Sequence, residues 1–233
     1  MPRRVPNTPR LTKSRRGKRG NEIISAYWHI GGKRMKTGII LAGGEAKRAG
    51  GREKYLFEYE GETFLERLLS ALRDTVDEII IVARDDMHCR RFEGICAGFD
   101  AKIVADIRKG LGPVGGLHAA VQAAGGETLF AVACDMPFVN RDVIKYLFSF
   151  SDGYDAVIPR WNEGFIEPLH AVYRRDALEK YMHSHKSLSL RDMIGSINSY
   201  YVDVDDLRRY DADLRTFTNI NNLTELEKIN NRG

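Results

Sequence analysis

Short apolar runs alternate with segments of helical spacing along most of this chain, and this alternation constrains the fold more than any other feature. Four runs have the length and continuous apolar character of buried strands: 37–42, 78–83, 101–105 and 128–134. Helices are predicted between and after them, at 62–73, 113–124 and 141–150. Strands that alternate with helices of this length form βαβ units. We therefore predict an α/β fold with a doubly wound, mostly parallel sheet.

The C-terminal third has a looser rhythm. Further strands are predicted at 168–173, 200–204 (an edge strand) and 216–220, and short helices at 188–194 and 223–229. No internal repeat or low-complexity segment interrupts residues 35–233. We expect these residues to form one domain.

The N-terminal segment differs from the rest in charge. Residues 1–36 contain eleven Lys or Arg and one acidic residue, and without them the chain has a net charge of −6 instead of +4. We expect residues 1–34 to be a disordered or untranslated extension, with the functional protein starting at Met35. The codons of Gly31-Gly32 have the form GGN, so a purine-rich ribosome-binding site is compatible with the sequence just before Met35. The alternative is a basic arm that binds nucleic acid, which salt-dependent DNA binding would reveal.

Several classes of protein are excluded by composition. No apolar run approaches the roughly 20 residues that a membrane-spanning helix needs, and the N-terminus lacks the apolar core of a secretory signal. The three cysteines form no CxxC pair, which argues against a disulfide framework and a structural zinc site. A cytoplasmic location is expected.

A glycine-rich segment follows the first predicted strand. It reads LAGGEAKRAGGREK over residues 41–54 and combines four glycines with the cations Arg48 and Lys54. Glycines allow the backbone to approach a ligand closely and to direct N–H groups at phosphate oxygens. The segment fits neither the dinucleotide-binding GxGxxG nor the Walker A pattern. It predicts a phosphate-binding loop at the carboxyl edge of the sheet, where α/β proteins bind ligands.

Two carboxylates are expected at the same edge. Asp135 follows the strand at 128–134, and a carboxylate beside a phosphate site is the ligand that Mg²⁺ prefers. Asp106 follows the strand at 101–105, where metal binding, nucleoside binding and a turn all remain open. The glycine-rich stretch 110–116 then leads into a helix and offers a second place for a phosphate or a base.

Candidate acceptor-binding residues lie near the C-terminus. Asn219 and Asn221 sit in FTNINN, where Asn222 is instead expected to cap the helix at 223–229 with Glu225. Glu167 and His170 belong to EPLH, at the start of a predicted strand, although a lone histidine there is more often structural. We name four of these residues as acceptor-binding candidates: Glu167, His170, Asn219 and Asn221.

The ordered motifs LAGGEAKRAGGREK, GPVGG, CDMPF, EPLHAVY and FTNINN resemble those of the molybdenum cofactor guanylyltransferases and related nucleotidyltransferases. They extend from Thr37 to about Ile229. The resemblance implies a Rossmann-like, three-layer α/β/α nucleotidyltransferase fold. It also implies Mg²⁺-dependent transfer of GMP from GTP to molybdopterin, with pyrophosphate as the second product. The resemblance further implies transient contact with molybdenum insertion proteins or molybdoenzymes. It implies neither a membrane nor a nucleic acid as a partner.

The resemblance also implies roles for individual residues. The residues expected to bind the nucleotide are Leu41, Ala42, Gly43, Gly44, Lys54, Asp106 and Asp135. Among them Lys54 would contact phosphates, Asp106 the nucleoside and Asp135 the Mg²⁺, with Arg48 as a further catalytic cation. Two residues depart from the family pattern: Ala49 replaces the usual Met, and Arg84 stands where Asn is frequent.

Phosphoryl chemistry of this kind requires positioning and charge neutralisation more than a covalent nucleophile. This agrees with the lack of a Ser/His/Asp arrangement. The alternative within the enzyme class is a nucleotidyltransferase with another base or acceptor: a molybdopterin cytidylyltransferase, or an enzyme acting on a sugar phosphate, methylerythritol phosphate, phospholactate or cobinamide phosphate.

Overall fold

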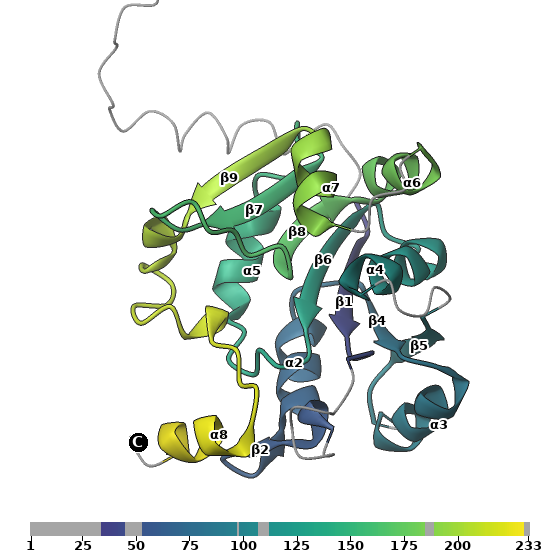
Figure 1. The fold of residues 1–233 in the computed structure, drawn as a ribbon, viewed down its shortest axis with the longest axis vertical. Helices are drawn as coiled ribbons and strands as arrows, with labels where there is room; N and C mark the ends of the chain where they lie inside the picture. Colours follow the sequence, from purple (N-terminus) through teal and green to yellow (C-terminus); the bar gives the residue numbers. More distant parts are fainter. Residues whose placement is uncertain (1–33, 45–52, 97, 107–111, 185–188, 231–233) are drawn as a thin grey trace, which may run out of the picture. The chain divides into compact units, whose positions relative to one another are not determined.

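Seven strands form the central sheet of the computed structural model (Figure 1). In chain order they are β1 (Lys36–Leu41), β4 (Glu78–Ala83), β5 (Ala101–Ala105), β6 (Thr128–Ala133), β7 (Ala156–Arg160), β8 (His170–Arg174) and β9 (Ser199–Asp203). Across the sheet they follow the order β5-β4-β1-β6-β8-β7-β9. Strand β8 is antiparallel to its neighbours β6 and β7, and every other pair in the sheet is parallel.

The structure describes residues 34–44, 53–96, 98–106, 112–184 and 189–230. They belong to one compact unit, Arg34–Gly233. The predicted roles of Arg48, of the basic segment 1–33 and of residues 110 and 111 lie outside the described residues.

Helices cover both faces of the sheet because successive residues of each buried strand point to opposite sides. Ile40 packs in a core with α2 (Phe64–Arg73), α3 (Asp86–Ile95) and α5 (Arg141–Phe148). Its neighbour Ile39 packs in a second core with α4 (Gly112–Ala123), α6 (Arg175–Ser184) and α7 (Leu190–Ser196). The predicted doubly wound, mostly parallel α/β fold with three layers is confirmed.

Local sequence explains where α2 begins. The Thr63 side chain accepts a hydrogen bond from the Glu66 backbone N–H, and the Glu66 carboxylate accepts one from the Thr63 backbone N–H, which makes a complete capping box. The apolar positions Leu65, Leu68 and Leu72 are fully buried against the sheet. This apolar face holds the helix against the sheet, where α2 contacts β4 and the Leu72 side chain lies close to Gly38 of β1.

One predicted element is wrong. Residues 216–220 do not form a strand: a 3₁₀ turn, η5 (Arg215–Phe217), is followed by irregular chain. The Thr216 N–H donates to the Asp211 carboxylate, and the Ile220 N–H donates to the Asp135 carbonyl. These separate partners replace a strand ladder. The predicted α8 (Leu223–Asn230) is confirmed, and Asn222 caps it by accepting from the Glu225 N–H.

Several elements were not predicted from the sequence. They are α3, α6 and β7, the small hairpin of β2 (Glu58–Tyr59) and β3 (Glu62–Thr63), and two 3₁₀ turns, η3 (Lys54–Leu56) and η4 (Val204–Leu207). Turn η3 begins at Lys54, the second residue after the segment 45–52. Among the helices of the described residues, none is long and apolar enough to span a bilayer.

The strand directions bring distant parts of the sequence to one edge of the sheet. Strands β1, β4, β5, β6 and β7 are parallel and all end there, whereas β8 begins there. The segments that follow Leu41, Ala83, Ala105 and Ala133 therefore meet at the carboxyl edge, as do the residues that precede His170.

Candidate functional site: a cavity at the carboxyl edge of the sheet

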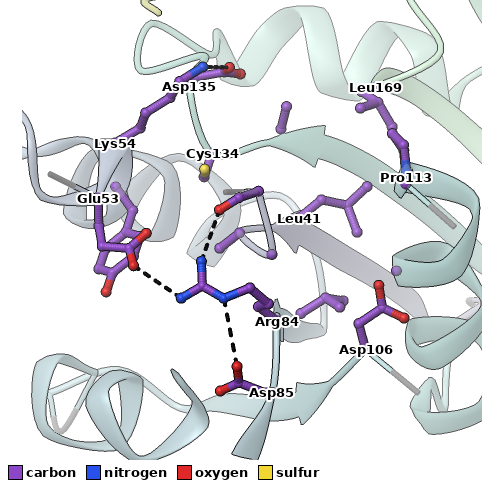
Figure 2. A pocket seen from close by; sticks show the side chains of 18 residues that line it. Leu41, Glu53, Lys54, Arg84, Asp85, Asp106, Pro113, Cys134, Asp135 and Leu169 are labelled. Atoms are coloured by element: carbon purple, nitrogen blue, oxygen red, sulfur yellow. Dashed lines mark hydrogen bonds and ion pairs between the residues drawn. The ribbon is translucent and has the colours of Figure 1, made fainter. Parts of the chain in front are cut away.

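A cavity of about 590 Å³ lies at this edge (Figure 2). Its wall includes the ends of β1, β4 and β6, the first residues of α4 and the residue before β8. The lining residues are Leu41, Ala42, Gly43, Gly44, Glu53, Lys54, Tyr55, Val82, Arg84, Asp85, Asp106, Gly112, Pro113, Gly116, Ala133, Cys134, Asp135 and Leu169. This volume suits a nucleotide-sized ligand.

The structure brings together every described residue that we named as nucleotide-binding. These residues line the same cavity: Leu41, Ala42, Gly43, Gly44, Lys54, Asp106 and Asp135. Figure 2 shows Lys54 and Asp135 on one side of the cavity and Asp106 on the other. The start of α4 contributes Gly112, whose φ of +58° is a conformation that suits glycine.

Lys54 and Asp135 are separated by 81 residues but are in direct contact. The Lys54 Nζ donates to Asp135 Oδ2 at 2.7 Å and to Asn221 Oδ1 at 2.8 Å. Each side chain of the ion pair is about 20% exposed, so the pair is largely shielded from water. Asn221 reaches this point because the Ile220 N–H is bonded to the Asp135 carbonyl. The C-terminal segment thus completes this side of the cavity.

A second ion pair lies beside the glycine-rich segment. Arg84 follows β4, and its guanidinium donates from Nη1 to the Gly44 carbonyl and from Nη2 to Glu53 Oε1, both at 3.3 Å. Its Nε lies 3.7 Å from Asp85 Oδ2. Figure 2 shows Arg84 between these partners on the cavity wall.

The buried side chain of His88 contacts two residues of this cavity wall, Arg84 and Tyr55. The Nδ1 of His88 accepts from the Arg84 backbone N–H at 3.2 Å, so the Nε2, 3.2 Å from the Tyr55 hydroxyl, carries the proton in the neutral ring. Burial lowers the pKa of His88 and keeps the ring neutral. Burial, with the nearby Glu53 charge, raises the pKa of Tyr55.

Cys134 lines the cavity next to Asp135 without being a nucleophile. Burial, followed by the charge of Asp135, raises the pKa of its thiol to about 12. The thiolate is the reactive form of cysteine, so this side chain stays protonated and inert at neutral pH. Chemistry in the cavity depends instead on charges and hydrogen-bond donors.

The four acceptor-binding candidates have different surroundings. Asn221 is in contact with Lys54, whereas Asn219 is exposed. Glu167 is half-buried, accepts from the Trp161 indole N–H at 2.8 Å, and has a pKa raised by burial. It lies two residues before Leu169 of the cavity wall.

His170 lies in the core and not on the cavity surface. Its exposure is 0%, its Nε2 is 3.2 Å from the Thr216 hydroxyl, and its ring packs edge-on against Phe130 and Phe217. Burial lowers the pKa of His170 to about 3. This environment is that of a neutral structural histidine which holds the segment leading to Asn221.

The oxygen atoms around Lys54 form a donor set suited to a hard cation. The Asp135 carboxylate and the Asn221 amide oxygen both point at one ammonium group, so they already converge on a positive charge. Mg²⁺ typically takes one or two protein carboxylates and completes its shell with water and phosphate oxygens. No group of three or more acidic, His or Cys side chains that could bind a metal occurs among the described residues. The residues present fit a metal that the substrate helps to bind.

Sequence reasoning did not assign Glu53, Tyr55, Asp85 or Leu169 to the cavity. Asp85 carried a signal, because it is a carboxylate two residues after the end of β4, as Asp106 is one residue after the end of β5. Glu53 and Tyr55 flank Lys54 in the chain and enter the wall with it. Leu169 had no sequence signal of this kind, since its place depends on the antiparallel insertion of β8.

Comparison with known proteins agrees with this geometry. The MobA-like NTP transferase domain matches residues 38–200. A probable molybdenum cofactor guanylyltransferase of Methanosarcina mazei is 37% identical over 84% of this chain and 90% of its own length. The molybdenum cofactor guanylyltransferase of Desulfosudis oleivorans is 34% identical over 82% of this chain and 93% of its own.

A solved structure gives the same result. The molybdopterin-guanine dinucleotide biosynthesis protein A of Archaeoglobus fulgidus superposes with a TM-score of 0.68 at 29% identity, over 85% of this chain and 98% of its own. The resemblance seen in the motifs is therefore confirmed over most of the described chain. The chain is a nucleotidyltransferase that belongs to the MobA-like NTP transferase family, among the molybdenum cofactor guanylyltransferases.

Proposed function

We propose that this protein transfers GMP from GTP to molybdopterin and releases pyrophosphate. The contact between Lys54 and Asp135 supports this most directly, because it joins the end of the glycine-rich segment to the end of β6 inside a nucleotide-sized cavity. The printed names of the relatives, guanylyltransferases for the molybdenum cofactor, support the choice of base and acceptor.

The proposed reaction is an in-line displacement. An oxygen of the acceptor's terminal phosphate bonds to the α-phosphorus of GTP, the bond from that phosphorus to the bridging β-phosphate oxygen breaks, and pyrophosphate leaves with its electron pair. Lys54 donates hydrogen bonds to the phosphates, and the backbone at Leu41, Ala42, Gly43 and Gly44 packs against the nucleotide. Arg48, outside the described residues, is proposed as a further cation for the leaving group.

Mg²⁺ is part of this proposal, with Asp135 as its protein ligand. When bound, it would neutralise negative charge on the phosphate oxygens. Lys54 forms an ion pair with the same carboxylate, so its ammonium group compensates the negative charge of Asp135 when no divalent ion is bound. Asp106, on the far side of the cavity, is proposed to contact the nucleoside.

The acceptor is proposed to enter on the Asp135 side. Asn221 already lies there, and Glu167 and Asn219 belong to the neighbouring segments. His170 is proposed to position these segments from the core, since it is fully buried. The location and the partners belong to the same proposal. The three cysteines, Cys89, Cys96 and Cys134, are free thiols, which supports a cytoplasmic location. The product would then pass to molybdenum insertion proteins or molybdoenzymes.

One experiment tests this function. The purified protein is incubated with Mg²⁺, molybdopterin and each of the four nucleoside triphosphates in turn, and pyrophosphate release is followed. We expect release with GTP that depends on molybdopterin. If CTP were the one triphosphate of the four that gives release with molybdopterin, this would support the cytidylyltransferase alternative. Release from GTP at the same rate with and without molybdopterin would reject molybdopterin as the acceptor.

A further inference from the structure

Arg84 contacts the chain on both sides of residues 45–52. The last described residue before them is Gly44, whose carbonyl accepts from Arg84 Nη1 at 3.3 Å. The first described residue after them is Glu53, whose carboxylate accepts from Arg84 Nη2 at 3.3 Å. Arg84 itself is anchored at the end of β4, the strand next to β1 (Figure 2). One side chain on the rigid sheet therefore connects the two flanks of the glycine-rich segment.

The backbone of Arg84 makes a parallel connection. Its N–H donates to His88 Nδ1, and the opposite nitrogen of that ring donates to the Tyr55 hydroxyl. Glu53 and Tyr55 are the two neighbours of Lys54 in the chain. Glu53 is therefore bonded to Arg84 directly, and Tyr55 is bonded to Arg84 through the His88 ring.

The charge of Glu53 shows why a cation is required here. Its side chain is 14% exposed in the wall of a cavity that receives a triphosphate. A largely buried carboxylate without a partner is costly, and here it would also repel the phosphates. Of the cations that the structure describes, Arg84 lies nearest to it, at 3.3 Å, while Arg91 lies at 3.9 Å and is 57% exposed. His88, also at 3.9 Å, is buried with a pKa lowered by burial and stays neutral.

We propose that Arg84 is a positioning residue, which holds Gly44 and Glu53 together and thereby places Lys54 for triphosphate binding. The guanidinium nitrogens Nη1, Nη2 and Nε each face a protein oxygen, so Arg84 acts through its neighbours. This inference rests on the proposed binding of a nucleoside triphosphate but not on the identity of the acceptor. The planar fork of arginine is essential to it, because a lysine ammonium cannot present two spread donors in the same way.

The test is a double-mutant cycle on nucleotide binding. Affinity for MgGTP is measured by calorimetry without any acceptor in the wild-type protein, Arg84→Ala, Glu53→Gln and the double variant. We expect Arg84→Ala to weaken GTP binding about tenfold or more, since it leaves Glu53 unpaired beside the phosphates. Glu53→Gln should cost less, and the double variant should bind GTP better than Arg84→Ala, because the charge that Arg84 offsets is then absent.

Controls separate this role from a direct contact and from misfolding. Arg90→Ala, an exposed arginine on α3, should bind GTP like the wild type. Arg84→Gln serves as a second variant that keeps an aliphatic stem and a polar end but removes the charge and the fork of donors, and it should weaken GTP binding as Arg84→Ala does. Melting temperatures verify folding. An unchanged GTP affinity in Arg84→Ala, or a double variant as weak as Arg84→Ala or weaker, would overturn the positioning role. A wild-type protein that binds no nucleoside triphosphate would instead reject the proposed function.

Discussion

Replacement of Asp135 by asparagine tests the proposed metal site most directly. Asparagine keeps the size of the side chain and an oxygen that can accept from Lys54 Nζ, which now lies 2.7 Å from Asp135 Oδ2. The negative charge is lost. We expect turnover to fall by about 10²-fold or more, which corresponds to about 2.7 kcal/mol of activation free energy at about 1.36 kcal/mol per factor of ten.

The fold should survive this change. The ion pair is about 20% exposed on each side, and Lys54 keeps its hydrogen bond to Asn221. A loss of about 1 kcal/mol in the free energy of unfolding is expected, which lowers the melting temperature of a chain this size by about 2–4 °C. A large loss of turnover with a small shift in melting temperature is therefore the predicted combination.

The assay is pyrophosphate release at saturating GTP and acceptor, over a titration of Mg²⁺. The variant should have a lower kcat and should need more Mg²⁺ to reach half of its own maximum. Asp142→Asn is the matched control, because Asp142 forms an exposed carboxylate–lysine pair with Lys145 at 3.1 Å outside the cavity. Wild-type turnover of Asp135→Asn at limiting Mg²⁺ would refute the assignment of Asp135 as the metal ligand.

Three further changes have defined outcomes. Lys54→Ala should raise the KM for GTP and lower kcat without altering the preference among the four nucleoside triphosphates, and a changed preference at an unchanged rate in the same assay would contradict a phosphate contact. Thr63→Ala removes the cap of α2 and should cost about 1 kcal/mol, or about 2–4 °C in melting temperature; an unchanged melting temperature would show that the Glu66 side chain suffices alone. His170 has a folded-state pKa of about 3 against an ordinary value of 6.5, so the unfolded chain binds more protons between these values and the folded state loses stability as pH falls below about 6.5. Urea unfolding from pH 7.5 to 5 should show this loss, and His170→Asn should flatten it; a slope that the variant retains would assign the loss to other groups.

Much of the fold follows from local sequence because the buried strands of a parallel sheet are continuous apolar runs. The predicted runs at 78–83 and 101–105 coincide with β4 and β5, and α2 begins one residue after the Thr63 cap. Strand β7 was harder to recognise, because AVIPR contains a proline and follows a polar turn. The predicted strand at 216–220 failed for a different reason. Its apolar residues are buried, but its N–H groups bond to the Asp211 carboxylate and to separate carbonyls, two of them within the local turn, and not to a neighbouring strand.

The candidate site, like the fold, was predicted in part from local sequence. Its chemistry was readable in the sequence, since a carboxylate or a glycine-rich segment directly after a buried strand must lie at the carboxyl edge of a parallel sheet. For this reason the sequence predicts that Asp106, Asp135 and Lys54 lie at one edge of the sheet, and all three line the same cavity.

Only the tertiary structure decided which side chains meet. The contact of Lys54 with Asp135 and Asn221 joins positions up to 167 residues apart, and the bond from Arg84 to Glu53 joins the residue after β4 to the residue before η3, 31 positions apart. Sequence spacing places a residue at the end of a strand, but the direction of its side chain depends on strand order and on packing from both faces. That is why the sequence determined the kind of site, whereas the folded chain determined its ion pairs.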